Sequence, residues 1–225
     1  LLSKDYARER AKEIDMTRAS AQTVAGALDG SEHTSYFCAV DEAGNAVSFI
    51  HSLSAFFGSG FVAGETGVLL NNRAGRGFFL EQNHPNVIAP GKRTMNTIQT
   101  YMVFKDDLPV IVGGTPGGDS QPPWNAQVIS NLLDYHMNVQ EAAEAPRWRH
   151  FPGTDPVGLG NPPQLRIDDG FPAEVLRILQ QKGHVSVIPP EDDIPGSVQL
   201  IRLDHASGIH MGGTDPHCDG HPMTQ

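Results

Sequence analysis

Apolar and polar positions alternate in two runs in the first quarter of the chain, and this pattern predicts β-strands. The runs TSYFCAVD (34–41) and AVSFIHSL (46–53) flank a short turn that contains Gly44, so they predict a β-hairpin. A second hairpin is predicted where YMVFK and PVIVGG are joined by two aspartates. Between the hairpins the chain is punctuated by glycine, and the run 67–70 is expected to form a short buried strand.

Apolar residues at helical spacing predict four helices. The last of them has proline in its first turn and Gly183 just past its end, which is typical of helix boundaries. The chain then closes with three strand-like runs, VSVIP, VQLIRL and GIHMGG. Strands followed by helices and again by strands favour a layered α+β sandwich over a strict alternation of strand and helix. The predicted helices span 2–14, 125–136, 139–145 and 172–182.

The composition excludes several classes of protein. Among 225 residues there are 16 Lys and Arg against 26 Asp and Glu, a net charge of -10. This charge argues against nucleic-acid and anionic-membrane partners, because both require a basic face. No apolar run approaches about 18 residues, so no membrane-spanning helix is predicted. Two cysteines, Cys38 and Cys218, do not make a disulfide framework and slightly favour a cytoplasmic over an exported location.

A threonine stands where a polar segment meets the first predicted strand. Residues 16–33 are small and polar and predict an exposed linker, a usual place for a chain to be cut. Thr34 could simply open the strand, or it could be a nucleophile exposed by cleavage of the bond between His33 and Thr34. A threonine hydroxyl needs a base at neutral pH, and a free α-amine on the same residue, with a pKa of about 7.7–8.0, can act as one. That amine exists only if the bond before Thr34 is broken.

A glycine-rich loop follows the last strand of the second predicted hairpin. The loop GGTPGGD (113–119) lacks the lysine of a phosphate loop and carries Asp119, which would repel phosphate, so nucleotide binding is rejected. The successive glycines Gly117 and Gly118 could present backbone N–H groups to one point, as an oxyanion hole requires, or could form a plain structural turn.

Cationic and metal-binding residue types occur at further places. Arg73 and Arg76 could be solvated surface residues or a clamp for a substrate carboxylate, which a guanidinium binds in a bidentate way. His51 neighbours Ser52, but adjacent residues of a strand point to opposite faces, so the two are not expected to meet. The histidines and the cysteine near the carboxyl end lack the spacing of a zinc site, and we expect no metal and no cofactor. These residues are His210, His217, Cys218 and His221.

These features occur together, and in the same order, in one protein family. The stretch TSYFCAVDEAGNAVSFIHSLSAFFGSGFVAGETGVLLNN, followed by APGKR, GTPGGDSQ and EAPRW, resembles the γ-glutamyltransferase (γ-glutamyltranspeptidase) family of N-terminal nucleophile hydrolases. The resemblance runs from Thr34 to about Trp148 and continues more weakly through 171–183 and the terminal GGTDP.

The resemblance implies a four-layer αββα sandwich, shared by two subunits that arise from one precursor by self-cleavage. It makes Thr34 the catalytic nucleophile, residues 34–225 the small subunit and residues 1–33 the tail of the large subunit, which would explain a start without Met. It implies that the two successive glycines form the oxyanion hole and that Ser52 hydrogen-bonds to the nucleophile. The substrate is then a small-molecule amide, whose acyl group passes through a threonine ester to water or to an acceptor amine.

The sequence departs from the family at positions that hold the substrate. An asparagine of the γ-glutamyl pocket is replaced by Ser54, and the glutamine and the acid that hold the α-ammonium read Arg73 and Arg76. The Ser-Ser pair for the α-carboxylate reads Asn96-Thr97. Arginine at an ammonium site should exclude the ammonium and favour a carboxylate or a neutral group. We therefore expect an amidohydrolase that prefers carboxylate-bearing acyl groups without an α-amine, such as glutaryl, and hydrolysis over transfer.

Two other hypotheses stay open at this point. A true γ-glutamyltransferase or glutathione hydrolase would tolerate these substitutions, and the rate with glutathione separates it from the first hypothesis. An uncleaved, inactive homologue that serves as a subunit scaffold would keep residues 1–33 attached to Thr34 and would not turn over substrate.

Overall fold

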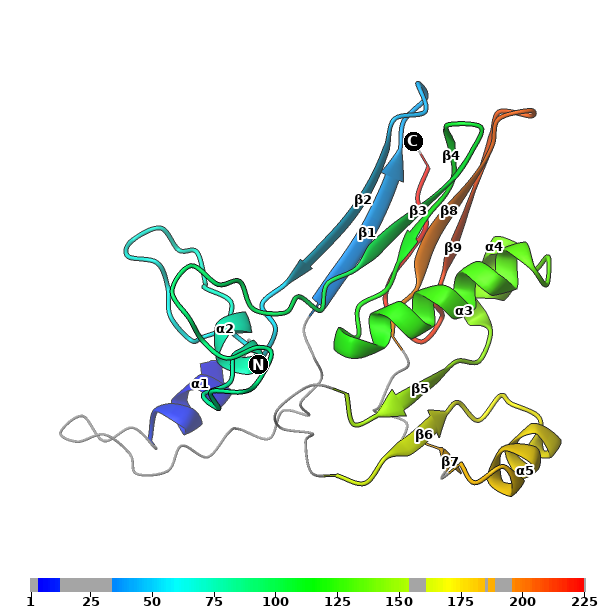
Figure 1. Ribbon diagram of the computed structural model, residues 1–225. Helices are drawn as coiled ribbons and strands as arrows, with labels where there is room; N and C mark the ends of the chain where they lie inside the picture. Colours follow the sequence, from blue (N-terminus) through cyan, green and yellow to red (C-terminus); the bar gives the residue numbers. More distant parts are fainter. Residues whose placement is uncertain (1–3, 13–33, 154–160, 185, 189–195, 225) are drawn as a thin grey trace. The chain divides into compact units, whose positions relative to one another are not determined.

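The chain divides into two units, Leu1–Gly30 and Ser31–Gln225. In the first unit, helix α1 spans Lys4–Ala11 and lies within the predicted helix 2–14. The predicted linker 16–33 lies outside the described residues. None of the described helices is long and apolar enough to cross a membrane. The computed structural model describes residues 4–12, 34–153, 161–184, 186–188 and 196–224 (Figure 1).

The second unit begins with the predicted hairpin, formed by β1 (Thr34–Val40) and β2 (Ala46–Ser52). The two strands pair antiparallel with Thr34 opposite Ser52, so the first residue of one strand lies beside the last residue of the other. Gly44 in the turn has a φ of 81°, a conformation that glycine adopts without strain.

The second predicted hairpin is part of a four-stranded antiparallel sheet with the strand order β3-β4-β8-β9. One face of this sheet packs against the β1–β2 hairpin, where the buried Tyr36 lies against the bare backbone of Gly114. A Cβ at Gly114 would lie 2.6 Å from the Tyr36 ring, so the close approach of the two sheets requires glycine at this position. The strands are β3 (Thr100–Lys105), β4 (Leu108–Gly114), β8 (Gln199–Asp204) and β9 (Ile209–Thr214).

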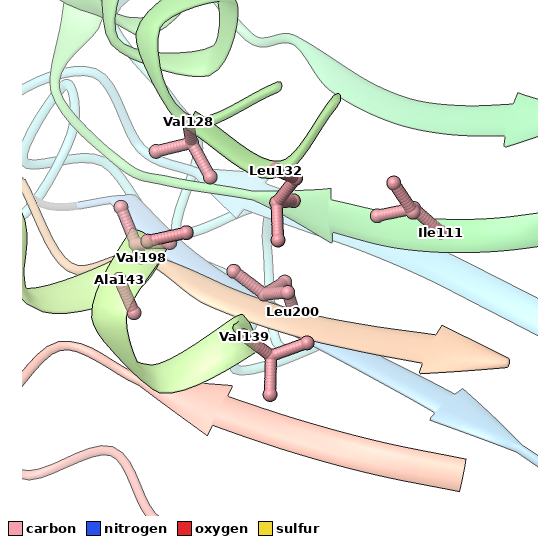
Figure 2. Close-up of a cluster of buried hydrophobic side chains, with 8 residues drawn as sticks. Ile111, Val128, Leu132, Val139, Ala143, Val198 and Leu200 are labelled. Atoms are coloured by element: carbon pink, nitrogen blue, oxygen red, sulfur yellow. The ribbon is translucent and has the colours of Figure 1, made fainter. Parts of the chain in front are cut away.

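Helices α3 (Gln121–Leu133) and α4 (Val139–Glu144) cover the other face of this sheet (Figure 1). Their apolar side chains meet those of β4 and β8 in one buried cluster (Figure 2). Burial of one such Val or Leu side chain contributes about 1.5–3 kcal/mol to folding. The hairpin, the sheet and the helices form successive layers, which confirms the predicted α+β class. The cluster consists of Ile111, Val128, Leu132, Val139, Ala142, Ala143, Val198 and Leu200.

A third, smaller sheet with the strand order β5-β6-β7 lies in the part of the chain that also contains the predicted helix α5. The strands β5 and β6 were not predicted, because each has only four residues and mixes charged with apolar positions. The guanidinium of Arg166 lies 3.6 Å from the centroid of the Phe151 ring, a cation–π contact that links these two strands. The elements are β5 (Trp148–Phe151), β6 (Gln164–Ile167), α5 (Ala173–Gln181) and β7 (Ser186–Val187).

Two details of the predicted elements are wrong. Helix α3 begins at Gln121 and not at Asn125, because two prolines fall in its first turn, where a missing N–H group costs no helical hydrogen bond. The run 67–70 forms no buried strand, since Leu69 makes only an isolated bridge with Val62 and the residues on either side are exposed. The surrounding glycines with positive φ hold this segment in an irregular loop.

Candidate active site

The register of the first hairpin places two hydroxyl groups together at one end of the strands. Thr34 Oγ donates a hydrogen bond of 2.9 Å to Ser52 Oγ, and both side chains are partly buried. The same Ser52 oxygen accepts the backbone N–H of Ser54 at 3.0 Å. Ser35 and His51 point to the opposite face of the hairpin and are exposed. The structure therefore brings Thr34 to Ser52 and keeps His51 away from both.

The titratable side chains between the hairpin and the sheet are unsuited as bases. Burial raises the pKa of the Tyr36 hydroxyl, the Cys38 thiol and the Tyr101 hydroxyl above their ordinary values. All three groups therefore stay protonated at neutral pH. Such surroundings suit a nucleophile that is activated by its own α-amine rather than by a neighbouring side chain.

Both predicted arginines lie on a short helix, α2 (Arg73–Gly77), and each of them contacts another residue that was predicted to bind the substrate. Arg73 Nη1 donates to Thr97 Oγ at 2.7 Å, and Arg76 Nη1 donates to the carbonyl oxygen of Ser54 at 2.7 Å. Both arginines are partly buried, so neither is a solvated surface residue. The structure thus links four of the five residues that were predicted to bind the substrate.

A buried glutamine, which sequence reasoning missed, fixes the segment that carries the fifth residue, Asn96. The Asn96 side chain is exposed and accepts the N–H of Ile98 at 3.2 Å. Gln121 is fully buried at the start of α3, and its Oε1 accepts the backbone N–H of Gln99 at 2.7 Å. Gln121 therefore ties the Thr97 segment to the helix that follows the glycine loop. A glutamine at a helix start has no distinctive pattern in the sequence.

The glycine-rich loop runs from the end of β4 into α3 through a single 3-10 turn. Gly117 has a φ of 132° and Gly118 a φ of 51°, both in the region that favours glycine. A Cβ at Gly117 would overlap the buried ring of Trp124, so this ring determines how the loop can run. The loop starts beside the ring of Tyr36, which lies on the strand that begins with Thr34.

Two segments that share the family pattern meet in a buried ion pair. The guanidinium of Arg147, from EAPRW, bonds to the carboxylate of Asp215, from GGTDP, and both side chains are at most 1% exposed. Arg147 also donates to the carbonyl of Ala143 and, through its backbone N–H, to Asp168, each at 2.7 Å. Burial raises the pKa of the Asp168 carboxyl. Removing one partner of such a buried pair costs about 3–5 kcal/mol, because the other charge is left uncompensated.

One of the histidines near the carboxyl end contacts the same network. His217 Nδ1 lies 2.7 Å from the second carboxylate oxygen of Asp215. Within the described ranges, no three His, Cys, Asp or Glu side chains are placed to hold a metal ion. Both cysteines are free thiols.

Comparison with known proteins identifies the class. Two sheets pack together and are covered by helices, and the first strand has a threonine as its first residue. This arrangement is that of an N-terminal nucleophile hydrolase. Residues 1–224 match the family model described as Gamma-glutamyltranspeptidase, and the chain belongs to this family.

Two curated relatives cover almost the whole chain. The "Glutathione hydrolase-like YwrD proenzyme" of Bacillus subtilis (strain 168) is 39% identical over 224 residues, which are 98% of this chain and 40% of that protein. The "Oxamate amidohydrolase proenzyme" of Klebsiella pneumoniae is 31% identical over 226 residues, again 98% of this chain and 40% of that protein. The chain therefore spans about two fifths of the length of these relatives.

Solved structures show the same relationship. The cephalosporin acylase from Bacillus halodurans has a TM-score of 0.72 at 35% identity and covers 98% of this chain, which corresponds to 38% of that chain. The γ-glutamyltranspeptidase from Pseudomonas nitroreducens has a TM-score of 0.70 at 27% identity. Its match covers 84% of this chain and 98% of that chain.

Proposed function

We propose that the complete protein is a self-processing amidohydrolase with Thr34 as its nucleophile. The observation that carries the proposal is the 2.9 Å hydrogen bond from Thr34 Oγ to Ser52 Oγ at the first residue of the first strand. The relatives support it, since they are named as glutathione hydrolase, oxamate amidohydrolase and acylase proenzymes.

The proposed boundary between the subunits is the bond between His33 and Thr34, with 1–33 as the tail of the large subunit and 34–225 as the small subunit. Thr34 pairs with Ser52, whose side chain accepts its hydroxyl, which supports Thr34 as the residue after the cut. The Pseudomonas chain is matched over 98% of its own length but covers 84% of this chain. The share left uncovered is about the share that residues 1–33 form.

Self-cleavage uses the threonine hydroxyl first. Thr34 Oγ attacks the carbonyl carbon of His33, the C–N bond between the two residues breaks, and an ester replaces the amide. Water then hydrolyses this ester, which leaves a carboxylate on His33 and a free α-amine on Thr34. The hydrogen bond to Ser52 orients the attacking hydroxyl.

Turnover uses the same hydroxyl again, now with the α-amine as base. Thr34 Oγ attacks the substrate amide and its proton passes through the amine to the leaving amine. The N–H groups of Gly117 and Gly118 stabilise the oxyanion of the tetrahedral intermediate. Water then attacks the ester and releases the acid, and an acceptor amine in place of water would give transfer.

We expect Gly117→Ala to lower kcat by about 10²–10³-fold, because alanine keeps the N–H group but moves it away from the oxyanion, and loss of one oxyanion donor usually has this effect. The added methyl group would overlap Trp124, so the loop has to shift. Gly44→Ala is the matched control, because Gly44 also has a positive φ of 81° but its Cβ would meet nothing within 4 Å. Steady-state kinetics of the two processed variants checks the prediction, and equal kcat values would contradict the oxyanion role.

The proposed substrate is an amide whose acyl group carries a carboxylate and lacks an α-amine. Arg73 and Arg76 are partly buried and bonded to Thr97 and Ser54, so both charges are held at the predicted pocket. A positive charge about 4 Å from another opposes it by about 4 kcal/mol at an effective dielectric constant of 20. This repulsion disfavours a γ-glutamyl ammonium, while a carboxylate finds a bidentate partner.

One relative favours a second candidate function. The glutathione hydrolase proenzyme of Escherichia coli (strain K12) is 33% identical over 230 residues. A glutathione hydrolase would release glutamate from glutathione at least as fast as it hydrolyses a glutaryl amide. An inactive scaffold would cleave neither itself nor either substrate.

The test is the intact mass and amino-terminal sequence of the complete precursor during incubation at neutral pH. We expect a new chain that starts Thr-Ser-Tyr-Phe, and hydrolysis of a glutaryl anilide that appears in step with it. A precursor that stays uncut for days would refute the proposal and leave the scaffold hypothesis.

The proposed partner is the large subunit, and the outer face of the hairpin offers it an apolar surface. Phe37 and Phe49 are 52% and 47% exposed, and their ring centroids lie 4.9 Å apart. Within the described residues the hairpin is a two-stranded sheet whose inner face packs on the four-stranded sheet, and these two rings lie on its outer face. Burial of each ring would contribute about 1.5–3 kcal/mol to the association.

We expect the double variant Phe37→Glu and Phe49→Glu to lose the large subunit, because two charges would be buried against an apolar partner. Size-exclusion chromatography of the processed protein shows whether both chains elute together. Ile209→Glu is the control, since Ile209 is 57% exposed on β9 of the other sheet. Co-elution of both chains in the double variant would contradict the proposed interface.

A further inference from the structure

A line of three hydrogen bonds joins a pocket arginine to the nucleophile. Arg76 Nη1 donates to the carbonyl oxygen of Ser54 at 2.7 Å. The backbone N–H of Ser54 donates to Ser52 Oγ at 3.0 Å, and the same oxygen accepts the hydroxyl of Thr34 at 2.9 Å. Both backbone groups in this line belong to one residue, so a shift of the Ser54 carbonyl also shifts its N–H.

Ser54 has a backbone conformation that needs outside support. Its φ is 73°, in the left-handed region that a serine adopts only at a cost. The guanidinium on its carbonyl and the Ser52 hydroxyl on its N–H both hold it there. Arg76 therefore helps to fix the backbone segment whose N–H group donates to the Ser52 oxygen.

The other pocket arginine is placed differently. Arg73 donates to the Thr97 hydroxyl, which lies on the segment before β3. The bond of Arg76 to the Ser54 carbonyl, in contrast, is the first of the three bonds that lead to Thr34.

We propose that Arg76 is a positioning residue that couples recognition of the acyl carboxylate to the reactivity of Thr34. The coupling rests on the proposed function, because it takes the carboxylate as the group that Arg76 meets. A guanidinium has five N–H donors, so it can hold the Ser54 carbonyl and a substrate carboxylate together. A bound carboxylate fixes the guanidinium, and through Ser54 it fixes the Ser52 oxygen towards Thr34. The substrate carboxylate therefore raises kcat and does not act through KM alone.

The rate of self-cleavage distinguishes a positioning role of Arg76 from a role in carboxylate binding alone. The cleavage uses the same Thr34 hydroxyl but no added substrate. A residue that only binds the acyl carboxylate would leave the cleavage rate as it is. A residue that positions Ser52 would change the rates of both reactions.

The test compares Arg76→Gln and Arg76→Lys in the complete precursor, with the exposed Arg202→Gln as the control. Intact mass gives the half-time of self-cleavage, and glutaryl and valeryl p-nitroanilides give kcat and KM with and without the acyl carboxylate. We expect Arg76→Gln to lengthen the cleavage half-time and to lower kcat for the glutaryl substrate, each by roughly tenfold or more, since a hydrogen bond from a charged group is lost. We expect Arg76→Lys, which keeps a charged donor, to recover part of both losses.

A second result is expected for the substrate pair. In the natural protein kcat for the glutaryl anilide exceeds kcat for the valeryl anilide, and in Arg76→Gln this difference disappears. Wild-type self-cleavage in Arg76→Gln, with only KM for the glutaryl anilide raised, would overturn the coupling and leave the amidohydrolase proposal standing. If circular dichroism shows that Arg76→Gln does not fold, Arg76→Lys decides the question. Self-cleavage at the wild-type rate in Arg76→Lys, with no change in kcat, overturns the coupling. Slower self-cleavage with a lower kcat supports it. A natural precursor that never cleaves would instead refute the amidohydrolase itself.

Discussion

Thr34→Ala should leave the precursor as a single chain and abolish hydrolysis. Both reactions start from the Thr34 hydroxyl, which the hairpin register holds 2.9 Å from Ser52 Oγ. Removing the nucleophile of a hydrolase lowers kcat by on the order of 10⁶. Intact mass would show one species throughout the incubation, and no chain with the amino-terminal sequence Thr-Ser-Tyr-Phe would appear.

Two neighbouring variants serve as controls for this experiment. Ser35→Ala removes one hydroxyl from the outer face of the hairpin and leaves Thr34 and Ser52 in place, so it should cleave like the natural protein. Thr34→Ser keeps a hydroxyl and should still cleave. Cleavage before residue 34 in Thr34→Ala would show that another group makes the cut and would remove the basis of the proposed mechanism.

The second large effect concerns the choice of substrate. Glutaryl and γ-glutamyl p-nitroanilides differ only in the α-ammonium, so their kcat/KM ratio measures how the pocket treats that charge. The repulsion of about 4 kcal/mol expected near either arginine corresponds to a preference of up to about 10³-fold for the glutaryl compound. We expect Arg73→Gln, which restores the uncharged residue typical of the family, to lower this ratio by at least about tenfold.

The matched control for this prediction is again Arg202→Gln, which removes an exposed arginine from β8. Its ratio should equal that of the natural protein, because screening by water and salt makes a surface charge weak. Similar kcat/KM values for the two anilides in the natural protein would contradict the proposed substrate class. They would favour the glutathione hydrolase hypothesis.

Local sequence patterns predicted most of the elements that carry the site. Period-two alternation located β1 and β2, and the two-aspartate turn located β3 and β4. The same approach failed for β5 and β6, because four residues of mixed polarity show no period. It also failed for 67–70, where an apolar composition suggested burial but the residues lie in a glycine-rich loop.

The sequence by itself also determined which residues to examine at the site. Thr34 stands at the first position of a strand pattern, and Gly117 lies in a run of glycines that follows a predicted strand. The substitutions Arg73 and Arg76 were visible against the pattern of the family. All of these are properties of one short segment each.

Only the tertiary structure decided which of these segments meet. Arg76 and Ser54 are 22 residues apart, and Arg147 and Asp215 are 68 residues apart. A repeating pattern reports which face a side chain takes on its own strand or helix. Which residue of another segment a side chain contacts depends on strand register and on how the layers pack. A local sequence pattern does not contain this information. The line of bonds from Arg76 to Thr34 is such a long-range property, because three separate segments have to fold together before it exists.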